Sequence, residues 1–217
     1  MNAPLDAILV GILLTGFLLL GSSRLVSCIR TVALQGMLLG FLTLAAAERD
    51  AVGRAAVLTV ASTAVKGFVF PWLLVRVLRG AQVRREIEPL VGYGASLLVG
   101  LGVLGLSLWL GTRLPRPDPP LSTLLVPVAL FTMLVGLVLI VTRRKALTQV
   151  LGYLVMENGI YAFGAGLVQE QPILVELGIL LDVLVAVFVM GIAIFHINRQ
   201  FDHIDTDRMA ALRDWTR

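Results

Sequence analysis

Apolar runs of about 20 residues alternate with short polar connectors along nearly the whole chain, and an α-helix of that length crosses a bilayer. Seven such helices are predicted, at residues 4–21, 25–47, 54–78, 89–112, 121–142, 146–168 and 172–197. The clearest break is RLPRPDPPLS, whose four prolines exclude a continuous helix. The pattern therefore predicts an all-α, polytopic membrane protein followed by a polar tail.

The composition supports a membrane protein. The 217 residues are 58% hydrophobic and 15% charged, and their mean hydropathy is +0.91. A soluble domain carries roughly 25% charged residues. The first apolar run has no basic segment before it and no small-residue cleavage site after it, so we expect a retained helix and no signal peptide. The single cysteine, Cys28, excludes a disulfide within the chain.

Basic residues are distributed unequally between the two predicted faces of the membrane. One face would hold Arg24, Arg30, Arg79, Arg84, Arg85, Arg143, Arg144 and Lys145. The opposite face would hold only Arg49, Arg54, Arg113 and Arg116. Because cytoplasmic connectors are enriched in Lys and Arg, the sequence predicts an external N-terminus and a cytoplasmic C-terminus.

Three ionisable side chains, Lys66, Glu157 and Asp182, lie near the middle of predicted spans. A charge at the centre of a bilayer costs roughly 2.5–3.5 kcal/mol on insertion scales, so such residues usually pair inside a bundle or line an ion path. These three residues are our candidates for proton or ion transfer.

Lys66 is the best candidate for a titrating group because a buried lysine can lose its proton, whereas an arginine cannot. Pro71 follows five residues later and removes a backbone hydrogen bond. Its ring also clashes with the carbonyl of Gly67, so we expect a kink beside Lys66. The alternative is a static ion pair between Lys66 and either Glu157 or Asp182.

Polar residues accompany both acids. Gln149 and Tyr153 precede Glu157 by two turns and one turn on one helix face, and Asn158 follows it. This strip could hold water and pass a proton, or it could only hydrogen-bond neighbouring helices. The residues that accompany Asp182 are His196, nearly four turns later at the predicted cytoplasmic rim, and Glu176, on a different face nearer the outside. For His196 the alternatives are proton entry and an interfacial or subunit contact.

Sequence motifs for catalysis and cofactor binding are missing. The sequence contains no P-loop, Rossmann fingerprint, zinc-binding helix or nucleophile elbow, and it lacks the histidine or cysteine sets that hold haem or iron–sulfur centres. We therefore expect no catalytic residue, no metal site and no cofactor in this chain. The basic residues lie in short loops, which indicates membrane topology and no nucleic-acid partner.

The C-terminal part resembles the three-helix K-like subunits of complex I and the C-like subunits of multisubunit antiporters. The matching segments are RRKALTQVLGYLVMEN, which contains Glu157, and ELGILLDVLVAVFVMGIAIF, which contains Asp182. One difference concerns the first acid. The K-like subunits have a G-x-E stretch, but here Gly152 leads to Leu154, and Glu157 lies one turn later.

The chain as a whole is more similar to the hydrogenase-4 component E family and its formate hydrogenlyase relatives. The segments that carry this resemblance are STAVKGFVFPWLL, YLVMENGIY, LGILLDVLVAVFVMGI and the tail FDHIDTDRMAALRDW. The resemblance implies three parts, namely a four-helix region at 1–112, a K-like three-helix region at 121–197 and a cytoplasmic tail at 198–217.

The resemblance implies a non-catalytic subunit of a respiratory, complex I-like assembly in the bacterial cytoplasmic (inner) membrane. Its partners would be antiporter-like membrane subunits and a peripheral arm with nickel–iron and iron–sulfur centres. Lys66, Glu157 and Asp182 would then contribute to proton or sodium translocation. Two alternatives stay open, an assembly scaffold that moves no ions and a small stand-alone transporter.

Overall fold

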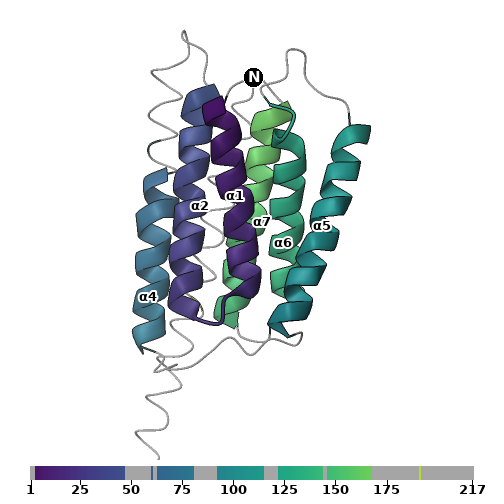
Figure 1. Ribbon diagram of the computed structural model, residues 1–217. Helices are drawn as coiled ribbons and strands as arrows, with labels where there is room; N and C mark the ends of the chain where they lie inside the picture. The colour runs from purple at the N-terminus through teal and green to yellow at the C-terminus, as the bar shows by residue number, and fades with distance from the viewer. Residues whose placement is uncertain are drawn as a thin grey trace, which may run out of the picture.

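A computed structural model describes residues 3–46, 60, 63–80, 92–114, 122–143, 146–167 and 191, and every regular element in them is helical (Figure 1). The elements are α1 (Ala3–Gly21), α2 (Leu25–Ala46), the π-helical turn η1 (Val65–Val69), α4 (Phe70–Gly80), α5 (Tyr93–Arg113), α6 (Leu125–Thr142) and α7 (Ala146–Leu167). The turn η1 continues directly into α4.

Among the helices that the structure describes, four are long and apolar enough to cross a membrane. These spans are Pro4–Gly21, Leu25–Leu44, Tyr93–Arg113 and Leu125–Thr142, in α1, α2, α5 and α6. The helix α7 has 22 residues but includes Gln149, Glu157 and Asn158, and it is not among the four. The prediction of an all-helical membrane protein is thus confirmed, but the number of seven spans is not.

The third and seventh predicted spans account for part of this difference. In the third, residues 54–78, the described structure consists of η1 and the 11-residue helix α4, preceded by a few helical residues. The seventh, residues 172–197, lies outside the described residues except for Gly191.

The helices lie side by side in a bundle, with α4 at one edge and α5 at the other (Figure 1). Among the described elements, the hairpin of α6 and α7 has the most extensive contact. The helix α1 packs against α2, α5 and α6, and α2 also packs against α7, η1 and α4. This arrangement places the π turn next to both α2 and α7.

Glycines bring α6 and α7 unusually close together. A Cβ atom added to Gly136 would lie 2.6 Å from the carbonyl oxygen of Gly152. One added to Gly152 would lie 2.9 Å from the oxygen of Gly136, and one added to Gly159 would lie 2.9 Å from the oxygen of Ala129. Small residues allow such close packing between helices in membranes. The backbone contact fixes α7, and hence Glu157, against α6.

A second glycine pair brings α2 against the segment that carries Lys66. Gly36 and Gly40 have the G-x-x-x-G spacing typical of closely packed transmembrane helices. A Cβ atom at Gly36 would lie 2.9 Å from the Cβ atom of Lys66, and one at Gly40 would lie 3.0 Å from the Cβ atom of Thr63. Lys66 can approach α2 only because Gly36 has no side chain.

The apolar core forms two clusters at different heights of the bundle. The upper cluster, as Figure 1 is drawn, consists of Leu5, Leu9, Ile12, Leu39, Leu42, Leu125, Val128, Ala129 and Ala162. The lower cluster consists of Leu19, Leu20, Cys28, Ile29, Val32, Phe70, Leu74, Phe131, Val135, Leu139, Leu147, Leu151, Leu154 and Val155. The lower end of the bundle is where α1 and α4 end and α2 and α7 begin.

Candidate functional site

A layer of buried polar side chains crosses the bundle between the two apolar clusters. This polar layer consists of Thr15 from α1, Gln35 from α2, Lys66 from η1, and Glu157 and Asn158 from α7. None of these residues is more than 8% exposed. In α2, for example, Gln35 lies between Val32 of the lower cluster and Leu39 of the upper cluster. The four elements therefore contribute polar groups at one common height.

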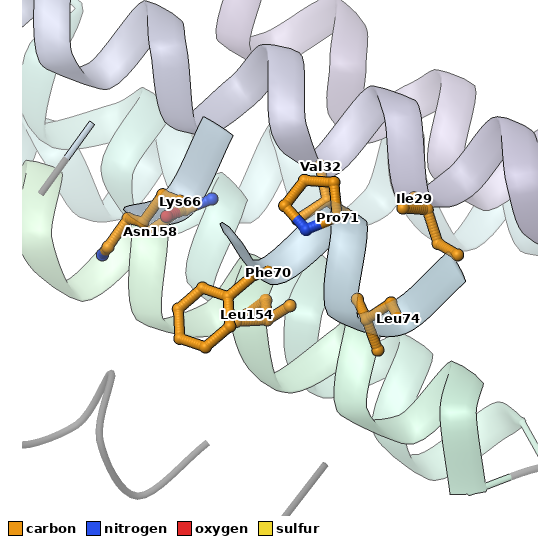
Figure 2. A pocket seen from close by; sticks show the side chains of 8 residues that line it. All are labelled: Ile29, Val32, Lys66, Phe70, Pro71, Leu74, Leu154 and Asn158. Carbon is orange, nitrogen blue, oxygen red and sulfur yellow. The ribbon is translucent and has the colours of Figure 1, made fainter. Parts of the chain in front are cut away.

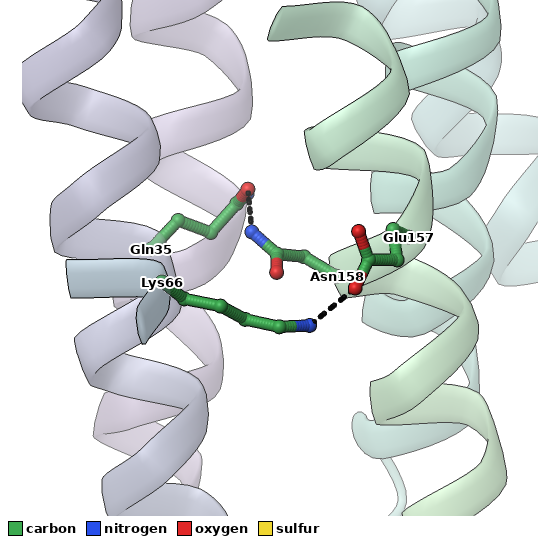
Figure 3. A network of polar contacts seen from close by, with 4 residues as sticks. All are labelled: Gln35, Lys66, Glu157 and Asn158. Atoms are coloured by element: carbon green, nitrogen blue, oxygen red, sulfur yellow. Dashed lines mark hydrogen bonds and ion pairs between the residues drawn. The ribbon is translucent and has the colours of Figure 1, made fainter. Parts of the chain in front are cut away.

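Lys66 and Glu157 form an ion pair inside this layer (Figure 3). The Lys66 Nζ atom lies 2.7 Å from Glu157 Oε1, and the two side chains are 8% and 2% exposed. The ammonium group also lies 5.2 Å from the centroid of the Tyr161 ring, a cation–π distance. The sequence left Glu157 and Asp182 as possible partners of Lys66, and the structure shows the contact with Glu157.

The other half of the layer is a directed chain of hydrogen bonds. Asn158 Nδ2 donates to Gln35 Oε1 over 3.2 Å (Figure 3), and Gln35 Nε2 donates to Thr15 Oγ1 over 3.1 Å. The Thr15 hydroxyl donates to the carbonyl oxygen of Ile12 over 2.6 Å. Side-chain amides do not titrate in water, and the last acceptor is a backbone carbonyl. This chain therefore orients α1, α2 and α7 and does not itself relay protons.

The π turn places Lys66 in the layer. The Phe70 N–H donates to the Val65 carbonyl five residues earlier, which closes a wider turn than in an α-helix. Pro71 follows at once and has no N–H, so the Gly67 carbonyl does not receive the bond that an α-helix would supply there. Isolated π turns in helices often occur at functional sites. The helix is thus irregular at the position where Pro71 predicts a kink.

A small pocket adjoins the polar layer between α2, α4 and α7 (Figure 2). Lys66 and Asn158 line one end, and Ile29, Leu74 and Leu154 line the part that extends toward the lower end of the bundle. The space open to the centre of a water-sized sphere is about 10 Å³. The pocket therefore joins two residues of the polar layer to the lower apolar cluster.

Arg143 is a second buried cation, at the lower end of the bundle and outside the polar layer. It is 2% exposed, its Nη2 atom donates to the Leu20 carbonyl over 3.1 Å, and its guanidinium lies 5.6 Å from the Tyr93 ring centroid. Burial lowers the pKa of Arg143 from its ordinary value. A guanidinium nevertheless stays protonated in proteins, so Arg143 is a structural cation.

The predicted strip along α7 is divided between different environments. Gln149 is exposed near the beginning of the helix, where its Nε2 atom donates to the Arg143 carbonyl over 3.1 Å. Tyr153 is half-buried against the lower cluster. Glu157 and Asn158 lie in the polar layer, with Lys66 and Gln35 as their partners. The sequence grouped Gln149, Tyr153, Glu157 and Asn158 in one polar strip, whereas in the structure Glu157 and Asn158 are the two of them in the polar layer.

Three predicted residues, Asp182, Glu176 and His196, lie outside the described residues, and their roles stay predictions. Within the described part, no group of three or more His, Cys, Asp or Glu side chains could hold a metal ion. The expectation that the chain holds no metal or cofactor also stays a prediction.

Gln35 and Thr15 were not among the predicted site residues. The available signal was a lone amide in the apolar run of α2, next to the first glycine of the G-x-x-x-G pair. Thr15 offers no comparable signal, since threonine in an apolar helix commonly bonds its own backbone.

Relatives of the chain show its family. It is 33% identical to the uncharacterized protein Rv0085 of Mycobacterium tuberculosis over 205 residues, which is 94% of this chain and 93% of that protein. The chain belongs to the family of this mycobacterial protein. No family model matches the chain, and no solved structure does.

Part of the chain is also similar to a hydrogenase component. The chain is 40% identical to hydrogenase-4 component E of Escherichia coli K12 over 97 residues, and the same figures hold for the Shigella flexneri protein. The match covers 43% of this chain and 45% of the hydrogenase component. The predicted resemblance is therefore confirmed for less than half of the chain.

Proposed function

We propose that the chain is a non-catalytic membrane subunit of a complex I-like, hydrogenase-type assembly, and that its polar layer takes part in moving protons or sodium ions. The partners would be antiporter-like membrane subunits in a bacterial cytoplasmic membrane. The partial relation to hydrogenase-4 component E supports membership in such an assembly. The buried Lys66–Glu157 pair is the observation that carries the transfer role.

The chemistry of this pair suits proton transfer. Moving one proton from the Lys66 ammonium to the Glu157 carboxylate gives an amine and a carboxylic acid, and no net charge is created in the apolar interior. An approaching charge in a neighbouring subunit shifts this balance, because electrostatic interactions are strong where water is excluded. Asp182 would provide a further acid in the same pathway.

An assembly scaffold is the second candidate, and a different observation favours it. The chain from Asn158 through Gln35 to Thr15 ties three helices together and ends on a backbone carbonyl. In a scaffold, the Lys66–Glu157 ion pair would hold η1 against α7. Its charges would then take no part in ion transfer.

The first experiment is purification in mild detergent through an affinity tag on this chain, followed by mass spectrometry of the proteins that accompany it. Antiporter-like subunits together with a nickel–iron or iron–sulfur arm are the expected result. A lone monomer or homodimer would contradict the proposal.

The second experiment separates transfer from scaffolding. The double variant Lys66→Met/Glu157→Leu removes both charges and keeps similar volumes, so the complex should assemble. We expect ion transfer to be lost, whereas a scaffold would retain it. Thr132→Val is the matched control, because Thr132 is 1% exposed and donates only to the Val128 carbonyl of its own helix, over 2.8 Å.

A further inference from the structure

We propose that the pocket between α2, α4 and α7 binds water and gives Lys66 access to one end of the bundle only, the lower end. The water site stands on the geometry of the pocket, whereas its part in ion transfer rests on the function proposed above. Four observations carry the inference, namely the size of the pocket, its polar groups, its direction and the apolar packing above the polar layer.

The size of the pocket suits one water molecule. About 10 Å³ is open to the centre of a water-sized sphere, and a cavity needs roughly 10–15 Å³ by this measure to hold one water. A bound water also needs two to four polar partners, since a cavity with only apolar walls stays dry. Size alone therefore does not decide whether the pocket is wet.

The polar groups come from the upper part of the pocket. Lys66 and Asn158 both line it, and an ammonium group donates hydrogen bonds while an amide both donates and accepts them. Lys66 and Asn158 are thus two polar partners, the smallest number that a bound water needs.

The direction of the pocket follows from its lining residues. Leu74 lies in α4, after Lys66 of η1 in the chain, whereas Ile29 and Leu154 precede the layer residues of α2 and α7. Because α4 ends and α2 and α7 begin at the lower end, the pocket runs from Lys66 toward that end (Figure 2). The sequence predicts that this basic end faces the cytoplasm.

Apolar residues pack above the polar layer, on the other side of Lys66 from the pocket. The Tyr161 ring centroid lies 5.2 Å from the ammonium nitrogen, and the upper cluster, including Leu39 and Ala162, lies above the layer. The amide chain of the layer ends at Ile12. Among the residues that the structure describes, the pocket is thus the proposed route of water to Lys66.

This geometry gives the pair an order of proton steps. Once Lys66 has passed its proton to Glu157, the amine takes a proton from a hydronium ion in the pocket, and neutral water remains. The carboxylic acid of Glu157 can then release its proton to an acceptor outside the polar layer. One proton enters and one leaves, and no electron moves.

Hydroxyl-radical labelling tests the water site directly, because radicals formed from bound water modify the side chains around it. The full chain would be irradiated in membranes and digested for mass spectrometry. Leu74 in the pocket and Leu39 in the upper cluster are the matched pair, since both are leucines and both are 2% exposed. We expect Leu74 to be modified at least fivefold faster than Leu39. Equal rates would overturn the proposal.

A pocket-filling variant tests the role of the water. Val32→Ile adds one methyl group to a lining residue, whereas Val128→Ile adds the same group in the upper cluster. We expect only Val32→Ile to bring Leu74 labelling down to the Leu39 rate and to slow ion transfer of the assembled complex severalfold. Lost labelling with unchanged transfer would overturn the access role. Unchanged transfer in Lys66→Met would instead count against the proposed function and leave the labelling result intact.

Discussion

Lys66 and Glu157 depend on each other for burial, since either one alone would be a charge in an apolar interior. Removing one member of such a pair typically costs about 3–5 kcal/mol, whereas replacing both by apolar residues is often neutral. The 2.7 Å contact and the low exposure of both side chains show that Lys66 and Glu157 form such a buried ion pair.

We therefore expect Glu157→Gln to lower the free energy of unfolding by about 3 kcal/mol, the lower end of the range for a broken buried pair. The double variant Lys66→Met/Glu157→Leu should recover most of that loss, because it leaves no unpaired charge. Thermal unfolding of the tagged chain in mild detergent measures both effects. A double variant as unstable as the single one would show that the pair does not act as a unit.

At the residue scale, the sequence indicated that Lys66 and Glu157 are buried charges, but it did not indicate that they contact each other. Lys66 and Glu157 could be recognised because a charge in the middle of an apolar run is costly. The partner of Lys66 was left open, since Glu157 and Asp182 lie on different predicted helices. The contact between Gln35 and Asn158 joins residues 123 positions apart, so only the packing of α2 on α7 reveals it.

At the element scale, the contact between α6 and α7 depends on glycine. An alanine at Gly136 would place its Cβ atom 2.6 Å from the Gly152 carbonyl oxygen, and the backbones would have to separate. We expect Gly136→Ala to lower stability by about 1–3 kcal/mol, as overpacking does. Thermal unfolding in mild detergent measures the loss. Gly102→Ala is the control, since its Cβ atom would meet nothing within 4 Å, and an equal loss there would refute the packing argument.

The contact between α2 and η1 makes a separate prediction. The Cβ atom of Gly36→Ala would lie 2.9 Å from the Cβ atom of Lys66 and would push the π turn away from α2. The Lys66 amine should then become several times more reactive toward a membrane-permeant acylating reagent. Mass spectrometry measures this, with Lys145, the only other lysine, as the internal reference. Unchanged Lys66 reactivity relative to Gly105→Ala would contradict the expected movement.

Hydropathy predicted the regular helices closely and missed the irregular one. The first predicted run, 4–21, corresponds to Ala3–Gly21, and the sixth, 146–168, corresponds to Ala146–Leu167. The run 54–78 reads as one helix, but the structure has the π turn Val65–Val69 before α4. The hydropathy of a segment indicates how favourable its burial is. It does not indicate whether a backbone N–H bonds to the carbonyl four residues earlier, as in an α-helix, or five residues earlier, as in a π turn.

At the scale of the whole molecule, the predicted orientation decides which compartment supplies the pocket. Arg24, Arg30 and Arg143 lie at the lower end of the bundle, and the positive-inside rule predicts that this end faces the cytoplasm. We expect a cysteine introduced at Ser23, in the connector between α1 and α2, to react with an impermeant thiol reagent only after the membrane is opened. A cysteine at Ser122, next to the beginning of α6 at the other end, should react in intact cells. The reverse pattern would mean that the pocket opens to the outside.

The π turn also ties function to the spacing of the chain. A ring closed over five residues contains one residue more than a ring closed over four, and each residue of an α-helix turns it by about 100°. Deleting a single residue between Lys66 and Pro71 would restore an ordinary helix and swing Lys66 by that angle, out of the layer and away from Glu157. A sequence with this deletion would keep every side chain of the site but would lose the contact between Lys66 and Glu157. When relatives of this chain are compared, an equal number of residues between the lysine and the proline is therefore as informative about the site as the lysine itself.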